Sequence, residues 1–239
     1  MPWYTGSCVI HQHSGGTVSD EFQSREYWYL LMATDADTAY AKSLILAQEI
    51  VKGPLGEGEG VWDVDGVSEL LLVGEAPSDG SELTWLQQEI LPNELDSYTR
   101  PKEELRIFNI SDRSSKASGW YVSELVLTEI HDTGSHGDSI LVWTNSHLIK
   151  AADAESAYKA AVDLGMKQAS ESGSHRCDGD VAHWQFIGLR GLVETIDAPR
   201  DGALLWFEEF TAGSGKLAQL VPPRQNLSVF EWEARQGRG

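Results

Sequence analysis

A chain of 239 residues with 41% apolar residues and a formal net charge of −19 has the composition of a folded acidic protein, which excludes an intrinsically disordered chain. An acidic surface repels phosphate backbones, so we expect no nucleic-acid binding and fast association with a basic protein; acidity that serves only solubility is the alternative. With no apolar run of eighteen residues and no signal-like N-terminus, we expect no membrane span and a cytoplasmic location.

The chain contains two similar halves. Residues 62–80 align without a gap on residues 184–202, and seven of these nineteen positions are identical. A period this long predicts tandem duplication of a domain rather than a solenoid of short units. Residues present in both halves are expected to serve the shared fold, and residues unique to one half are candidates for function. The predicted organisation is a first repeat at 1–110, a Ser-rich linker at 111–119, a second repeat at 120–234 and a tail at 235–239.

Each repeat predicts the same elements in chain order. Alternating apolar residues predict a strand over 4–10 and another over 27–33, and Thr34 or Asp35 then begins a helix with small residues along one face. A strand at Trp62, a turn of sequence Ala-Pro-x-Asp-Gly and two further strands complete the repeat. The last two strands are expected at Trp85 and 105–107, and in the second repeat at Trp206 and 227–229.

This order predicts an α+β fold made of two tandem β-β-α-β-β-β repeats, each an antiparallel sheet covered by one helix. Whether the two sheets join into one or pack face to face stays open. Cys8 and Cys177 do not correspond between the repeats. We therefore expect no disulfide, and interpret Cys8 as a small core residue in a reducing environment.

Three motifs carry a resemblance to a known family: Trp120-Tyr121 at the start of a repeat, the helix-opening segment 153–158 (DAESAY), and W-x-F-x-G at 184–188. Their order over 120–196 resembles the small bacterial domains called domain of unknown function 4288. The first repeat departs from the pattern, because Asp63-Val64-Asp65-Gly66 follows Trp62 in place of x-F-x-G. The resemblance implies a bacterial origin and brings no catalytic residue.

Candidate metal ligands occur in three places. His11 and His13 lie two apart on a strand, and His175, Cys177 and His183 cluster in the second repeat with Asp178 and Asp180. We favour an exposed strand end for the first pair and a loop for the second cluster, and predict no metal site. Asp63 and Asp65 lack the downstream acidic ligand of a calcium loop, so we expect a strand surface that faces solvent or a partner.

Other motifs are interpreted as structural. The glycine-rich segments 53–60 and 213–216 do not have the order or the spacing of a phosphate-binding loop, and no G-x-S-x-G motif occurs. Trp28 and Trp143 match no tryptophan in the other repeat, so they are candidates for a surface with a function. Six tryptophans recur at matched positions, which favours core packing: Trp3, Trp62 and Trp85, matched with Trp120, Trp184 and Trp206.

The leading hypothesis is a non-enzymatic binding protein, of the immunity or regulatory type, that engages a basic macromolecular partner. It depends on the charge of −19 and on the lack of any catalytic constellation in the sequence. No cofactor and no catalytic residue are predicted. The alternative is an enzyme, or a protein that binds a small molecule or a metal, with its site at the seam between the two repeats.

Overall fold

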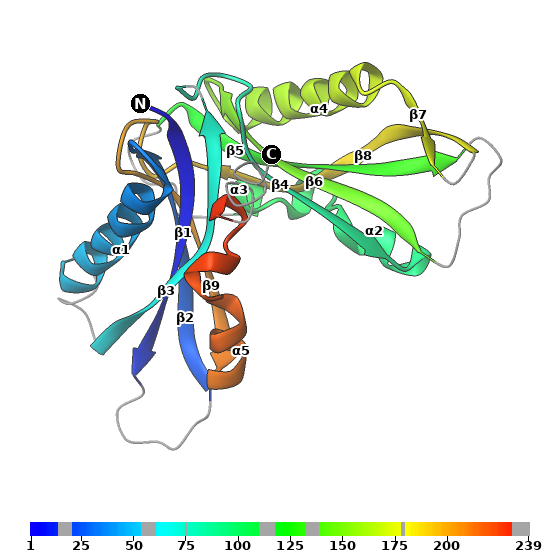
Figure 1. Cartoon of the computed structure of the whole chain (residues 1–239). Coiled ribbons are helices and arrows are strands. Elements are labelled where there is room, and N and C mark those ends of the chain that lie inside the picture. Colours follow the sequence, from blue (N-terminus) through cyan, green and yellow to red (C-terminus); the bar gives the residue numbers. More distant parts are fainter. Residues whose placement is uncertain are drawn as a thin grey trace. The chain divides into compact units, whose positions relative to one another are not determined.

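The computed structural model divides the chain into two compact units (Figure 1). Unit 1 consists of Met1–Ala76 with Ile196–Gly239, and unit 2 of Pro77–Thr195. Each unit combines an antiparallel sheet with helices, which confirms the predicted α+β class. No helix in the described part of the chain is long and apolar enough to cross a membrane. The described residues are 1–13, 21–53, 61–74, 76–109, 118–131, 139–177 and 180–230.

The sheet of unit 1 has four antiparallel strands in the order β3-β1-β2-β9. Helix α1 packs over β1, β2 and β3, and the short helix α5 packs on the other face of the sheet. The small buried residues Ala36, Ala39 and Ala47 let α1 lie close to the strands. The bounds are Trp3–His13 for β1, Glu21–Met32 for β2, Val61–Gly74 for β3, Ala203–Gly213 for β9, Ala36–Lys52 for α1 and Ser214–Leu220 for α5.

The sheet of unit 2 has five antiparallel strands in the order β4-β6-β5-β8-β7. Helix α4 packs over β5, β6 and β8, and the short helix α2 contributes to a cluster on the other face. The bounds are Glu82–Ile90 for β4, Trp120–His131 for β5, Ile140–Lys150 for β6, Ser174–Cys177 for β7, Asp180–Glu194 for β8, Leu95–Tyr98 for α2, Arg106–Asn109 for α3 and Ala154–Glu171 for α4.

Each sheet contains one strand from the other half of the chain. Strand β4 pairs with β6 rather than with β2, and β9 pairs with β2 rather than with β6. Both pairings contain a bulge, at Leu83 in β4 and at Leu205 in β9, and both leucines are buried. The two compact units therefore differ from the predicted repeats, since each unit holds the last strand of the other repeat. The linker predicted at 111–119 lies largely outside the described residues.

The fifth strand predicted for each repeat is wrong. Residues 105–107 follow a 3₁₀ turn over Lys102–Glu104 and enter α3, and residues 227–229 follow the same kind of turn over Arg224–Asn226. Leu105 and Ile107 are both buried, so their spacing of two imitates the alternation of a strand. The turn bonds themselves, such as Leu105 N–H to the Lys102 carbonyl at 3.2 Å, belong to a helical turn.

The predicted helix starts are confirmed at Asp35 and Asp153. Each aspartate accepts a bond of 2.7 Å from the backbone amide three residues later, which is the geometry of an N-cap. The bonds from Thr38 hold the pKa of Asp35 below its usual value. A basic side chain then lies over the tyrosine of each helix: Arg224 over Tyr40 in unit 1, and Lys102 over Tyr158 in unit 2. The helix-opening motif therefore serves capping and packing.

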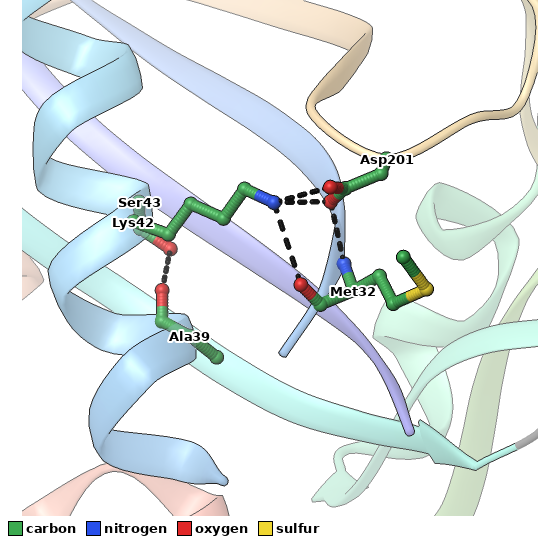
Figure 2. A network of polar contacts seen from close by, with 5 residues as sticks. All are labelled: Met32, Ala39, Lys42, Ser43 and Asp201. Carbon is green, nitrogen blue, oxygen red and sulfur yellow. Dashed lines mark hydrogen bonds and ion pairs between the residues drawn. The ribbon is translucent and has the colours of Figure 1, made fainter. Parts of the chain in front are cut away.

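The Asp-Gly turn before β9 and the one before β4 are each anchored to the end of the strand with which β9 or β4 pairs. In unit 1, Asp201 accepts a bond from the Met32 amide at the end of β2 (2.8 Å) and pairs with Lys42 of α1 (Figure 2). Partial burial acts to raise the pKa of Asp201, but the bonds from Lys42 and Met32 hold it below its usual value. In unit 2, Asp79 accepts from the Lys150 amide (2.8 Å), and an alanine takes the place of Lys42. The shared aspartate therefore fixes where β9 and β4 each begin.

Candidate functional site

The two sheets can be compared residue by residue through their pairing registers, and residues at matching register positions are called counterparts below. The bulges at Leu83 and Leu205 extend the gap-free alignment of the two halves through β4 and β9. Trp85 then corresponds to Phe207, and Trp206 corresponds to Thr84. The expected match of Trp85 with Trp206 is wrong. Trp85 and Trp206 are therefore each unmatched by a tryptophan in the other unit.

In unit 1 an arginine lies between two aromatic rings on the sheet face that α1 covers. The Arg25 guanidinium lies 4.9 Å from the ring centroid of Trp62 and 5.5 Å from that of Phe207. It also makes an ion pair of 2.6 Å with Glu209, its register partner on β9. The cation is thereby enclosed by two π faces and one carboxylate.

In unit 2 the counterpart of Arg25 is Trp143. Its ring stacks on Trp184 with the centroids 4.8 Å apart, and Trp85 meets it edge-on at 6.5 Å. Gln87 takes the place of Glu209 opposite it. The indole N–H of Trp143 is buried and has no hydrogen-bond partner. Unit 2 therefore presents a row of three tryptophans where unit 1 presents a paired cation.

A polar cluster continues from this row toward α4. His147 is 2% exposed; its Nδ1 bonds the Gly80 carbonyl at 3.1 Å and its Nε2 lies 2.9 Å from the Gln168 amide nitrogen. These contacts require Nδ1–H as the donor and Nε2 as the acceptor. Burial lowers the pKa of His147, and burial raises the pKa of the nearby Glu82. The oxygens of the Asn145 and Gln168 side-chain amides are buried and unbonded. This cluster holds a neutral histidine against the turn that precedes β4.

Strand β4 forms one edge of the unit 2 sheet. Residues 84–90 pair with β6 and with no other strand in the described chain. Trp85 is 55% exposed and Leu86 is 51% exposed, and adjacent residues of a strand lie on opposite faces. Core packing was expected for Trp85, and its exposure shows that this expectation is wrong. An edge with large apolar side chains on both faces is a surface on which another chain can pair.

None of the family models, curated proteins or solved structures with which the chain was compared matches it.

A pocket in unit 2 begins at the far end of the tryptophan row. It has a volume of about 710 Å³ and lies between the C-terminal half of α4 and the start of β8. Trp184 and Phe186 form its aromatic wall, and Ser170, His183 and Gln185 are its polar lining. Phe186 fits here because Gly165 of α4 has no side chain, and a Cβ at that glycine would lie 2.4 Å from the ring. The pocket is apolar and has no cluster of titratable groups suited to catalysis.

Trp28, the other tryptophan expected at a functional surface, pairs within unit 1. Its ring stacks on Trp206, which faces it across β9, with the centroids 5.0 Å apart. Beside this pair, Glu26 faces Glu208, and burial is the main reason why the pKa of Glu26 is raised. Ser68 donates a bond of 2.6 Å to Glu26. The sequence signal for this arrangement is the unmatched Trp28. Its partner Trp206 is not identified from the sequence, because Trp206 is matched there with Trp85.

The structure brings together part of the predicted metal candidates. His11 bonds Asp65 through Nδ1 at 2.9 Å, so a residue of the histidine pair and a residue of the acidic strand are in contact. The loop predicted for the second cluster is wrong, because His175 and Cys177 lie in β7 and His183 lies in β8. The two histidines are not partners in the register, which pairs His183 with Ser174 and His175 with Ala182. The side chains of His13, His175 and Cys177 and the whole of Asp178 lie outside the described part of the chain. Among the described residues no group of three or more ligating side chains is found.

The remaining predicted motifs are also located. Cys8 is fully buried in the unit 1 core and unpaired, as expected, and burial raises the pKa of its thiol. Segment 213–216 spans the junction of β9 and α5, whereas most of segment 53–60 lies outside the described residues. Sequence reasoning missed the exposed edge of β4. The signal is the contrast between Trp85-Leu86 and its counterpart Phe207-Glu208, which the match of Trp85 with Trp206 hides.

Proposed function

We propose that the chain is a non-enzymatic, acidic binding protein that engages a basic protein partner through the β4 edge of unit 2. The observation that carries the proposal is the exposure of Trp85 and Leu86 on an edge strand, at 55% and 51%. Natural proteins usually protect an unpaired edge strand with charges, because an edge with exposed apolar side chains can pair with another chain. The counterpart edge in unit 1 has such a charge, because Glu208 replaces Leu86.

Charge supports a basic partner. The carboxylates of Glu82 and Glu89 are exposed on either side of Trp85, on a chain with a net charge of −19. Basic side chains can pair with these two carboxylates and stack on the indole between them. With this binding we propose an immunity-type or regulatory role in the cytoplasm, and a relation to the bacterial domain family that residues 120–196 resemble.

We also propose that the two halves arose by duplication and then exchanged their last strands. Support comes from features found in both sheets at one spacing: the bulge leucines, the turn aspartates and the cations that lie over the helix tyrosines. These shared features maintain the fold. Residues that differ between the units, such as Trp143 and Leu86, are then the ones available for function.

The experiment is capture with a matched control. The wild-type chain and the double variant E82Q/E89Q are immobilised and exposed to native lysate, and retained proteins are purified and remeasured by calorimetry at two salt concentrations. We expect a basic protein whose affinity falls at higher salt and falls about 10-fold or more in the variant. The control E49Q/D163N removes the same charge from exposed sites on α1 and α4 and should bind as the wild type. Equal binding by both double variants would contradict the proposal.

A further inference from the structure

We propose that the partner binds by strand addition: an extended basic segment pairs with β4 as a sixth strand of the unit 2 sheet. This inference depends on the proposed function and adds the mode of binding and the chemistry of the bound segment. The alternative within the same function is docking of a folded basic surface on the side chains alone. Three features of β4 favour strand addition: its backbone, its side chains and its charges.

The outward backbone groups of β4 can be assigned from β6. Leu148 donates to the Ser81 carbonyl and accepts from the Gly80 amide, so its backbone faces β4. Alternation along β6 then directs Ser146, Thr144, Val142 and Ile140 toward β4 as well. Their register partners in β4 are Thr84, Leu86, Gln88 and Ile90. The N–H and C=O groups of Trp85, Gln87 and Glu89 therefore point away from the sheet and form a three-residue template for another strand.

The side chains of this template are already positioned. Trp85 rests edge-on against Trp143 at 6.5 Å, and Trp143 is stacked on Trp184. A ring held in this way loses little conformational freedom when a ligand covers it, so its contact area contributes efficiently to affinity. Leu86 on the opposite face gives an added strand a second apolar contact, which a folded surface docking on one face cannot reach.

The charges define the class of segment that fits. Trp85, Gln87 and Glu89 alternate on one face of β4, and Glu89 is oriented by a bond of 3.0 Å from Ser139. An added strand places the residues i, i+2 and i+4 beside these three side chains. A basic residue fits opposite Glu89, and a second basic residue, four positions away, can lie on the Trp85 ring. The inferred ligand is an extended segment with basic residues at alternate positions.

Strand β9 forms an edge of the unit 1 sheet, and a comparison of its side chains with those of β4 shows why β4 is preferred. At the corresponding positions β9 has Phe207, Glu208 and Glu209, and Glu209 is already paired with Arg25. Phe207 is only partly exposed. The apolar contacts that an added strand needs are therefore present on β4 and reduced on β9.

The test uses a ten-residue peptide with alternating Lys and Thr as the probe, and the full-length chain in two variants. Q87P removes an outward N–H while leaving the bonds of β4 to β6, and Q87A is the matched side-chain control. We expect Q87P to bind the peptide at least about 10-fold more weakly than Q87A, and Q87A to bind within about 3-fold of the wild type. Equal binding by Q87P and Q87A would overturn strand addition.

A second measurement does not require Q87P to fold. Amide exchange in the wild-type chain, followed by NMR, should show new protection at Trp85, Gln87 and Glu89 when the peptide is added, and little change at Leu86 and Gln88. Protection at none of the three amides, with binding that still depends on Glu82 and Glu89, would overturn strand addition but leave the proposed function intact. Binding that is insensitive to E82Q/E89Q would overturn both.

Discussion

The two units treat the same position in opposite ways. In unit 1 the residue between two aromatic rings is Arg25, which is held by Glu209, and in unit 2 it is Trp143, which faces Gln87. The aromatic neighbours are conserved in kind, since Trp62 corresponds to Trp184 and Phe207 to Trp85. Where unit 1 has a cation and its carboxylate, unit 2 therefore has an indole and an amide.

This difference has a consequence for the strand edge. Arg25 binds the carboxylate beside it and lies over the Phe207 ring, so the unit 1 edge is satisfied from within. Trp143 needs no counterion, and it supports Trp85 from behind while Trp85 stays more than half exposed. At the same backbone position, one edge strand thus carries a carboxylate paired with Arg25 and the other carries an exposed indole beside it. The difference between the two edges therefore lies in side-chain identity at a shared backbone position.

The largest expected effect comes from breaking the strand exchange on which the comparison depends. L83A should destabilise unit 2 by about 2–5 kcal/mol, because Leu83 is buried in the bulge of β4 and its removal leaves a cavity. L205A should do the same to unit 1. Amide exchange measures the effect: L83A should accelerate exchange in β6, and L205A in β2. The reverse pattern, with L83A loosening β2, would show that each repeat keeps its own last strand.

Much of the fold could be predicted from the sequence because local signals determine it. The cap aspartates, the small helix residues and the alternating strands all specify structure within a few neighbours, and the helix and four strands of each repeat lie where expected. The strand exchange could not be predicted. Strands β2 and β6 have the same alternation of side chains, so the hydrophobic pattern alone cannot decide which of them pairs with β4.

The candidate site was harder for a different reason. Trp143 has no tryptophan as its counterpart, as predicted, but the match of Trp85 with Trp206 predicts Trp85 in the core, where the structure does not place it. Exposure of an edge strand depends on which strand is its last neighbour, and that is a property of the topology. Residues 105–107 were misassigned because two buried residues spaced by two occur in a helical turn as well as in a strand.

An intermediate effect is expected from converting one unit toward the other. W143R should destabilise unit 2 by about 2–4 kcal/mol, because it removes a stacked ring and leaves a charge without its carboxylate. The double variant W143R/Q87E rebuilds the pair seen in unit 1 and should recover about 1 kcal/mol. The free energy of unfolding of unit 2 is measured by urea unfolding, with amide exchange in β6 as the probe. Q87E alone should change stability by less than about 0.5 kcal/mol. No recovery in the double variant would mean that the ion pair of unit 1 does not explain the exchange of residues.

The smallest effect concerns a polar difference between the units. His147 of unit 2 has Tyr29 as its counterpart, and burial lowers the pKa of His147 below its ordinary value of 6.5. The folded state therefore resists a proton that the unfolded chain accepts. Unit 2 should lose stability as the pH falls below about 6.5, with a slope of at most about 1.4 kcal/mol per pH unit from this single group.

The pH test needs to separate His147 from Glu82, whose titration acts with the opposite sign. Burial raises the pKa of Glu82 above 4.5, so the folded state takes up this proton more readily than the unfolded chain and gains stability as the pH falls. Stability is therefore measured from pH 7.5 to pH 5 in an E82Q background, with and without H147N. Asparagine can keep the bond to the Gly80 carbonyl, which accepts from Nδ1 at 3.1 Å, but it does not titrate. We expect H147N to flatten the profile of unit 2 while the β2 amides of unit 1 show no change. A profile that keeps its slope in H147N would assign the pH dependence to other groups, and the neutral histidine would then be a packing residue that stabilises the turn before β4.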